Sequence, residues 1–285
     1  MNRSPVGHRR GILLIAPSAF WLTAFFLLPL LLVLGISLVE RGRAGGVRIP
    51  LSFTLDHYAQ LLDPLYLGIL WNSVRIAGIV TVTCVLLGYP LALMISRAPR
   101  RWRNALLLLV MIPFWTNFLV RTYALKQVLA SEGVVNALLQ AVGAIAEPLG
   151  LLFTLFAVVV GLVYGYLPFA VLPMYASVEK FDVTLLHAAA DLGANQARAF
   201  WRVMLPLTLP GVAAAVVLVF VPVLGAFITP DILGGGKVEM IGTIINRQFG
   251  VARNWPLGSA MSLFLMALVI LGVLAYLRGG EDPSL

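Results

Sequence analysis

Charged residues are scarce in this sequence. Only 11% of its 285 residues are charged, while 60% are hydrophobic and the mean hydropathy is +0.96. Soluble domains usually carry about 25% charged residues. The shortage of charge therefore indicates that water is not the main solvent of the folded surface.

Cysteine and metal-binding patterns are missing as well. Cys84 is the single cysteine, which excludes an internal disulfide and a thiolate metal site. The three histidines, His8, His57 and His187, are scattered without metal-ligand spacing. We therefore expect no metal and no cofactor.

Catalytic and nucleotide-binding motifs are also absent. Residues 234–237 (Gly-Gly-Gly-Lys) resemble part of a phosphate-binding loop, but that motif needs glycine at position 231 and serine or threonine at position 238. The chain has Asp231 and Val238 there. No serine lies in a G-x-S-x-G pattern. We expect no intrinsic catalysis, so any ATP hydrolysis must come from a partner subunit.

Long apolar stretches without charge make up most of the chain. A transmembrane helix needs about 20 apolar residues, and five of six stretches exceed that length. The third is short, and it reaches full length as a helix through Leu125 if Arg121 extends its charge toward the lipid headgroups. The sequence thus predicts an all-α polytopic membrane protein, a single domain over residues 1–285 with six transmembrane helices. Their predicted bounds are about 11–39, 73–96, 104–125, 150–176, 205–229 and 256–277.

The predicted spans contain few charged side chains that could bind or relay an ion. No Asp, Glu or Lys lies in the middle of any of them, which disfavours an ion-coupled secondary carrier or channel, the alternative from another functional class. Dependence of transport on ATP would separate the two classes. Prolines in the fourth and fifth spans are expected to break or kink those helices.

Arginine density predicts the orientation. Arg97–Arg103 contains four arginines in seven residues between the second and third spans, and short cytoplasmic loops are rich in Lys and Arg. Both termini are then cytoplasmic, and Gly11–Val39 is a retained first span rather than a signal peptide. The net charge of +8 favours contact with anionic membrane lipid. No basic helix or stacking platform accompanies that charge, so we expect no nucleic-acid partner.

A long polar segment, residues 179–202, joins the fourth and fifth spans. Good helix formers over Glu179–Leu192 predict a helix, Gly193 permits a sharp turn, and Asn195–Arg202 predicts a second short helix. Small side chains at Ala188–Ala190 allow this segment to lie deep in a groove of a soluble partner. The alternative is an amphipathic helix at the membrane interface without a partner.

The spacing inside this segment is specific. His187-Ala-Ala-Ala-Asp-Leu-Gly193 is followed, thirteen residues after the glycine, by Pro206 in Val203-Met-Leu-Pro206. The spacing resembles the pattern E-A-A-x3-G-x9-I-x-L-P of permease subunits in ABC importers, with His187 in place of the glutamate and Val203 in place of the isoleucine. The resemblance implies a cytoplasmic coupling helix that docks on a dimer of cytoplasmic ABC ATPases. The implied coupling residues are His187, Ala188, Ala189, Asp191, Gly193, Leu205 and Pro206.

Five further motifs lie along the chain between the third and the last predicted span. They are Pro113–Tyr123, Gly161–Phe169, Leu172–Lys180, Gly225–Gly235 and Arg253–Pro256. They resemble spermidine/putrescine permease subunits of the PotB type, in the binding-protein-dependent type I transport permease family. The resemblance implies a type I ABC importer permease (MetI-like) fold in a bacterial inner membrane. It also implies a second homologous permease subunit, an extracytoplasmic solute-binding protein, and transport of polyamines or a related small cationic solute. Transport of a different small organic solute stays an alternative.

Selection of a cation needs acidic or aromatic side chains along a translocation path. The candidates are Trp115, Tyr164, Tyr166, Asp231 and Glu239. The alternatives are interface anchoring or packing for the aromatic residues, and a solvated loop or docking of the binding protein for the acidic ones. At about 100° per residue, Tyr164 and Tyr166 lie some 200° apart on a helix. We therefore expect one of them to line the path and the other to pack.

Overall fold

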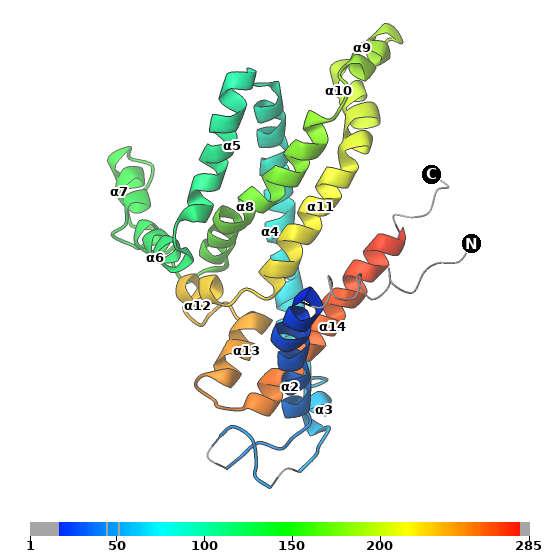
Figure 1. Cartoon of the computed structure of the whole chain (residues 1–285). Helices are drawn as coiled ribbons and strands as arrows, with labels where there is room; N and C mark the ends of the chain where they lie inside the picture. Colours follow the sequence, from blue (N-terminus) through cyan, green and yellow to red (C-terminus); the bar gives the residue numbers. More distant parts are fainter. Residues whose placement is uncertain (1–16, 44, 51, 280–285) are drawn as a thin grey trace, which may run out of the picture. The chain divides into compact units, whose positions relative to one another are not determined.

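The computed structural model describes residues 17–43, 45–50 and 52–279 (Figure 1). Within these ranges the regular elements are helices, apart from isolated β-bridges. The chain divides into two compact units, Met1–Pro64 together with Ile245–Leu285, and Leu65–Ile244. That residues 1–285 act as one domain stays a prediction.

The first unit contains an N-terminal apolar helical segment and the C-terminal helix. Its elements are η1 (Thr23–Leu27, a π-helical turn), α2 (Leu28–Ser37), α3 (Asp56–Gln60) and α14 (Trp255–Gly279). α14 packs against α2 and α3. The N-terminal helical segment runs from Pro17 to Ser37, and residues 11–16 of the predicted first span lie outside the described residues.

The second unit contains the long helices that the sequence predicted as spans two to five. Its elements are α4 (Pro64–Arg97), α5 (Arg100–Trp115), α6 (Phe118–Leu129), α7 (Val134–Ala141), α8 (Leu155–Glu179), α9 (Thr184–Asp191), α10 (Gln196–Ala199), the π-helical turn η2 (Phe200–Met204), α11 (Leu205–Leu224), α12 (Ile228–Gly234) and α13 (Ile241–Phe249), whose last residues belong to the first unit.

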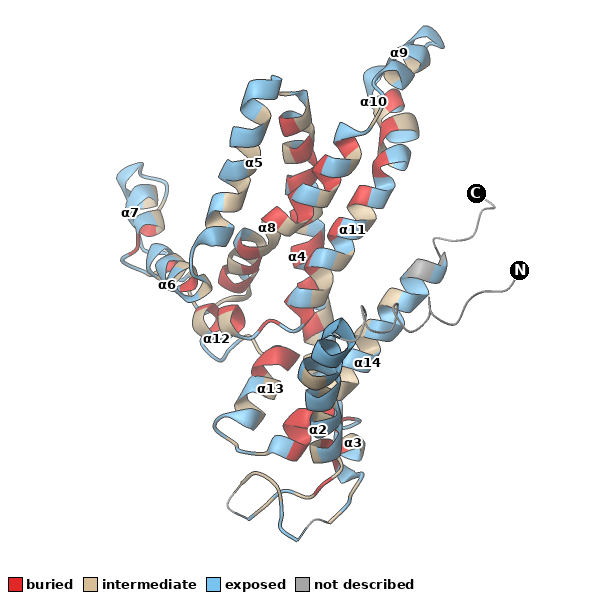
Figure 2. Cartoon of the chain, viewed as in Figure 1, coloured by how far each residue is buried: buried red, intermediate tan, exposed pale blue. Residues whose placement is uncertain are grey.

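The core of the second unit lies between α8, α11 and α4, whose buried residues are red in Figure 2. Glycines permit close approach of these helices. An added Cβ at Gly211 of α11 would lie 2.4 Å from Cβ of Ser177, and one at Gly88 of α4 would lie 2.7 Å from Cε of Met174. Fully buried apolar side chains fill the space between them. They include Val80, Leu162, Val171, Met174 and Val219.

In the part of the chain that the structure describes, five helices are long and apolar enough to cross a membrane, and a bent pair makes a sixth if it counts as one span. We expected a single helix over residues 104–125. Instead α5 ends at Trp115, and the helical chain continues over Phe118–Ala141 at an angle of 90°. Thr116 is extended, and the Asn117 side chain accepts hydrogen bonds from the second and third N–H groups beyond it. An asparagine cap of this kind starts a new helix instead of continuing the old one.

Prolines do not end the fourth and fifth spans. α8 continues through Pro168 and Pro173, and α11 continues through Pro210 and Pro222. We expected a break or kink in these spans, and no break occurs at these four positions. A proline removes one helical donor, while the packing of α8 along α11 keeps the neighbouring turns in place.

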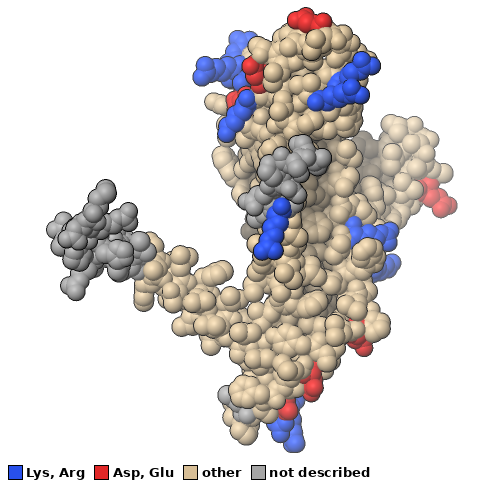
Figure 3. Space-filling view, turned by 90° about the vertical axis from the view of Figure 1, so that its right-hand side faces the viewer, with Lys and Arg blue, Asp and Glu red and all other residues tan. Residues whose placement is uncertain are grey.

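Short elements gather at both ends of the long helices in the second unit (Figure 1). The α4–α5 turn, α9 and α10 lie at one end, while α6 and α12 lie at the other. Figure 3 shows Lys and Arg gathered at the first of these ends, where Arg97, Arg100 and Arg101 are exposed. The arginine-rich turn and the α9 segment therefore face the same side.

Candidate coupling and translocation sites

The Asp182 side chain, in the turn that precedes α9, accepts a hydrogen bond at the start of that helix. The helix expected over Glu179–Leu192 is interrupted, so that α8 ends at Glu179 and α9 starts at Thr184. Oδ1 of Asp182 accepts a hydrogen bond from the backbone N–H of Thr184 at 2.9 Å. That bond to Thr184 stabilises the carboxylate and holds the pKa of Asp182 below its ordinary value. Asp182 thus favours a fresh helix start over continuation of α8.

A left-handed turn at Gly193 ends α9. Its φ is +83°, a conformation that glycine adopts without steric cost. The N–H of Gly193 donates to the carbonyl of Ala190 at 2.8 Å, and the N–H of Ala194 donates to that of Ala189 at 3.0 Å. Oδ1 of Asn195 then accepts a hydrogen bond from the backbone N–H of Arg198, in α10, at 2.8 Å. The predicted turn at Gly193 is confirmed, and hydrogen bonds fix it on both sides.

α10, η2 and α11 form one continuous helix from Gln196 to Leu224. We expected Asn195–Arg202 to be a separate short helix, and it is instead the beginning of the fifth span. Leu205 and Pro206 stand at the start of α11, directly after the π-helical turn. Proline has no N–H, so it fits a place where the hydrogen-bond pattern changes. The turn at Gly193 is thereby joined to a membrane span through an unbroken helix.

α9 has two different faces. One face lines a cavity of about 340 Å³ through Val183, Leu186, His187 and Ala190. The other face exposes Leu185, Ala188 and Leu192, and the side chain of Leu192 is 90% exposed. Ala189 is half-buried and Asp191 is exposed. The outer face is therefore small and apolar, while the inner face is turned toward the rest of the second unit.

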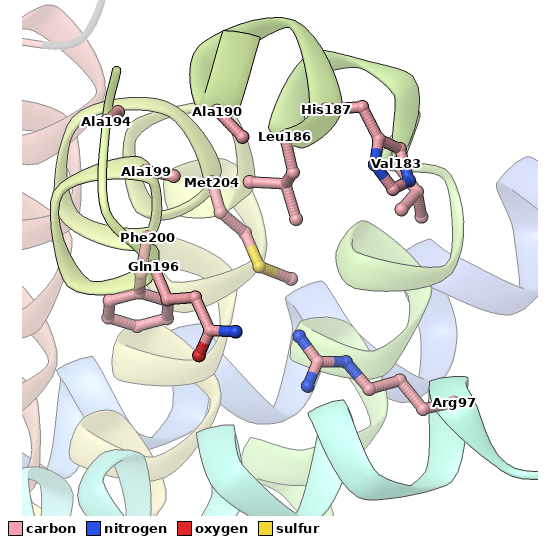
Figure 4. A pocket seen from close by; sticks show the side chains of 10 residues that line it. All are labelled: Arg97, Val183, Leu186, His187, Ala190, Ala194, Gln196, Ala199, Phe200 and Met204. Carbon is pink, nitrogen blue, oxygen red and sulfur yellow. The ribbon is translucent and has the colours of Figure 1, made fainter.

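The cavity beneath α9 brings together residues that are far apart in the sequence. Figure 4 shows the guanidinium of Arg97, from the end of α4, reaching toward Met204, while the ring of His187 hangs from α9. Gln196 and Phe200 line the cavity from the side of α10 and η2. Arg97 was not predicted as a site residue, because the sequence marks it only as part of the arginine-rich α4–α5 turn.

The predicted path residues are spread over the second unit. Trp115 ends α5 with a side chain that is 73% exposed. Asp231 is exposed on α12, and Glu239 is half-buried before α13. The backbone carbonyl of Glu239 accepts a hydrogen bond from Nδ2 of Asn72 at 2.8 Å. These three residues lie on two helices and one loop that are separate in the sequence.

Tyr164 and Tyr166 have different surroundings on α8. The Tyr166 ring centroid lies 6.0 Å from that of Phe169, which lies 5.3 Å edge-to-face from that of Phe114 on α5. Tyr166 is half-buried in this group, whereas Tyr164 is 40% exposed. The contacts favour packing for Tyr166 and leave Tyr164 as the stronger candidate for a path residue.

A cation lies on the ring of Tyr164. Cζ of Arg121 is 5.6 Å from the Tyr164 ring centroid and 5.2 Å from that of Phe118. We expected Arg121 to extend toward the lipid headgroups. The bend at Asn117 places it instead beside the end of α5, where it donates a hydrogen bond to the carbonyl of Pro113. The sequence alone gave no signal of this contact, because it depends on the bend.

Two glycines on α8 allow the bent segments to pack there. An added Cβ at Gly161 would lie 2.4 Å from Cδ1 of Leu233 and 2.8 Å from Cγ2 of Thr229, both on α12. One at Gly165 would lie 3.6 Å from Nη2 of Arg121 on α6. The glycines four residues apart therefore serve contacts of α8 with α12 and α6.

Comparison with known proteins places the chain in a family. Residues 84–278 match the family described as binding-protein-dependent transport system inner membrane component. The chain is 44% identical to the spermidine/putrescine transport system permease protein PotB of Haemophilus influenzae over 261 residues, which are 92% of this chain and 91% of that protein. For the protein of the same name in Escherichia coli, the identity is 44% over 92% of this chain and 94% of that protein.

A solved structure has the same fold. It is a bacterial alginate ABC transporter in complex with an alginate pentasaccharide-bound periplasmic protein, and one of its chains matches with a TM-score of 0.78 and 19% identity over 98% of each chain. The predicted type I ABC importer permease (MetI-like) fold is confirmed. The chain belongs to the family of binding-protein-dependent transport system inner membrane components, among the relatives of the spermidine/putrescine permease PotB.

Proposed function

We propose that this chain is the transmembrane permease subunit of an ATP-driven importer of polyamines. The observation that carries the proposal is the identity of 44% to PotB proteins over 92% of the chain. Such similarity over most of both chains makes a shared transport role the simplest explanation. The chain supplies the membrane path and performs no catalysis of its own.

The α9 segment is the coupling site in this proposal. Leu185, Ala188 and Leu192 form a small apolar surface on an exposed helix, which suits burial in a groove of a soluble ATPase. His187, Ala189 and Asp191 lie on the same helix, and Gly193 fixes its end. Leu205 and Pro206 begin α11, so that a displacement of α9 and α10 reaches the fifth span through one continuous helix.

The partners follow from the same role. We infer a dimer of cytoplasmic ABC ATPases on the α9 side, a second homologous permease subunit in the membrane, and a solute-binding protein on the opposite side. Both termini are cytoplasmic, and the protein spans a bacterial inner membrane. The arginine-rich α4–α5 turn lies at the same end as α9, as a cytoplasmic loop requires.

The aromatic side of α8 is the proposed path for the cation. Tyr164 offers a partly exposed ring, and a ring face attracts an ammonium group by about 0.5–2 kcal/mol, which is weak enough for release. Trp115, Tyr166, Asp231 and Glu239 are further candidates. Tyr166 is expected to act by packing, because it contacts Phe169.

Reconstituted transport tests the proposal. A tagged chain is purified with the subunits that bind it, placed in liposomes and supplied with the binding protein. We expect uptake of spermidine and putrescine that requires ATP on the α9 side, and no uptake when the ATPase carries a catalytically inactive nucleotide site. Uptake driven by an ion gradient without ATP would establish a secondary carrier. ATP-dependent uptake of another solute alone would reject polyamines as the cargo.

A further inference from the structure

Arg121 lies where α5 ends and α6 begins. The bend leaves carbonyl groups in the last turn of α5 without helical donors. One of them, the carbonyl of Pro113, accepts hydrogen bonds from Nη1 of Arg121 at 2.5 Å and from Oγ1 of Thr116 at 2.7 Å. Arg121 therefore replaces a missing helical donor, and this bond holds its guanidinium at the bend.

The other side of the guanidinium faces aromatic rings. Cζ lies 5.2 Å from the ring centroid of Phe118 and 5.6 Å from that of Tyr164. Both distances fall within the range of about 6 Å in which a cation and a ring face attract one another. Gly165 follows Tyr164, and an added Cβ there would meet Nη2 at 3.6 Å. The guanidinium is thus close to the surface of α8.

Among the described residues, no carboxylate pairs with Arg121. The partners of its guanidinium are the Pro113 carbonyl and the two rings. A carboxylate would hold a guanidinium by charge-assisted hydrogen bonds, which are stronger than contacts to ring faces. Because ring faces hold a cation only weakly, a second cation is able to replace Arg121 on Tyr164.

We propose that Arg121 is a tethered cation that covers the ring of Tyr164 until an ammonium group of the substrate replaces it. The inference rests on the proposed transport of polyamines. Arg121 competes for the ring and also repels a second positive charge nearby. Both effects weaken retention of a bound polyamine, so they favour its onward passage.

Lys126 offers a matched control on the same helix. Its Nζ lies 5.9 Å from the ring centroid of Tyr123 and 5.8 Å from that of Phe153. Lys126→Met removes one positive charge from α6 and ends its contacts with two aromatic rings. It leaves the contact of Arg121 with Tyr164 in place. A general effect of helix charge would therefore appear in Lys126→Met, whereas an effect on the Tyr164 ring would not.

Uptake kinetics in liposomes containing the complete importer test the inference. In Arg121→Met we expect the KM for spermidine to fall about threefold to tenfold, which lies within the range expected for one weak cation–ring contact. The maximal rate should fall as well, because release is slower. Tyr164→Phe keeps the ring and should retain the parental KM, while Lys126→Met should stay within about twofold of it.

The double variant identifies the site of exchange. Tyr164→Leu removes the ring, so in the Arg121→Met background it should cancel the fall in KM, a non-additive result that contacting residues show. If KM falls equally with and without the ring, the charge acts by repulsion alone and the proposal is wrong. An unchanged KM in Arg121→Met would overturn it too.

Folding and function are separated by further measurements. Assembly of each variant with its partners is measured by size-exclusion chromatography. If Arg121→Met does not assemble, Arg121→Gln, which keeps a donor for the Pro113 carbonyl but has no charge, must show the same fall in KM; a parental KM rejects the proposal. Arg121→Lys keeps the cation and should stay closest to the parental KM. A parental importer that takes up no polyamine rejects the proposed function itself, and the role of Arg121 with it.

Discussion

Oη of Tyr89 and Oγ1 of Thr208 lie 2.7 Å apart and join α4 to α11 across 119 residues of sequence. Thr208 is also within 2.8 Å of the carbonyl oxygen of Met204, the last residue of the π-helical turn. The ring of Tyr89 meets that of Phe200 edge-to-face at 5.8 Å. These contacts connect α4 to the start of the fifth span, close to the point where the α9 segment joins it.

The Tyr89–Thr208 bond predicts unequal costs for its two deletions. In Tyr89→Phe the Thr208 hydroxyl still donates to Met204, so the loss should be about 0.5–1.5 kcal/mol. In Thr208→Val the buried Tyr89 hydroxyl loses its partner, and the loss should be about 1–3 kcal/mol. Thermal unfolding in detergent measures both. The double variant should cost less than the sum, and equal, additive costs would mean that the bond contributes nothing.

If α9 is the coupling helix, two single changes should uncouple ATP hydrolysis from transport. Gly193→Pro is incompatible with a φ of +83° and removes the N–H that bonds to Ala190. Ala189→Glu puts a charge and extra bulk on a half-buried position of α9. We expect either variant to insert and assemble while uptake falls at least tenfold and ATPase activity no longer responds to the loaded binding protein.

Ala137→Glu is the matched control for the glutamate variant. Ala137 is exposed on α7, which lies across the second unit from α9 (Figure 1), so the same chemical change there should leave coupling intact. Parental uptake and normal ATPase stimulation in both α9 variants would contradict the assignment of α9 as the coupling helix. Loss of assembly in detergent would point to folding instead of coupling.

The parts of the structure that depend on local sequence were predictable. Gly193 signals its turn by residue type alone, and the uncharged runs signal most of the long helices. The bend at Asn117 was not predicted, because Pro113–Leu125 is compatible with one helix. The Asn117 cap and the packing of α6 and α12 on α8 together favour two. Arg97 and His187 line the same cavity because the end of α4 and the helix α9 lie close together in the fold. Their spacing in the sequence does not predict this. The contact of Arg121 with Tyr164 follows from the bend and was missed with it.

Asp182 predicts a pH-dependent start of α9. Its folded pKa is lowered by the hydrogen bond from Thr184, so the stabilisation is present above the ordinary aspartate pKa of about 3.9. It is lost as the pH falls through the lower folded value. A nitroxide on Ala188→Cys, in a Cys84→Ala background, should therefore become more mobile only below about pH 4.

Variants of Asp182 separate the loss of its hydrogen bond with Thr184 from general acid unfolding. Asp182→Asn keeps a side-chain acceptor that does not titrate, so α9 should stay ordered at a lower pH than in the parental protein. In Asp182→Ala, the nitroxide on α9 should be mobile at every pH. Identical pH profiles in Asp182→Asn and the parental protein would show that another group controls the order of α9.

The orientation is testable by cysteine labelling from outside the cell. Single cysteines are placed in a Cys84→Ala background at Arg101 and Ala197, which are exposed at the α9 end, and at Lys237, which is exposed beyond α12. Lys237 is preferable to its neighbour Gly235, because an added Cβ at Gly235 would lie 2.2 Å from Cδ1 of Phe153. A charged maleimide does not cross the hydrocarbon of the inner membrane, so in intact cells it should label the cysteine at 237 alone. After lysis all three should react to a similar extent, which controls for local accessibility. Labelling at 101 and 197 in intact cells, with protection at 237, would reverse the orientation and place α9 out of reach of any cytoplasmic ATPase.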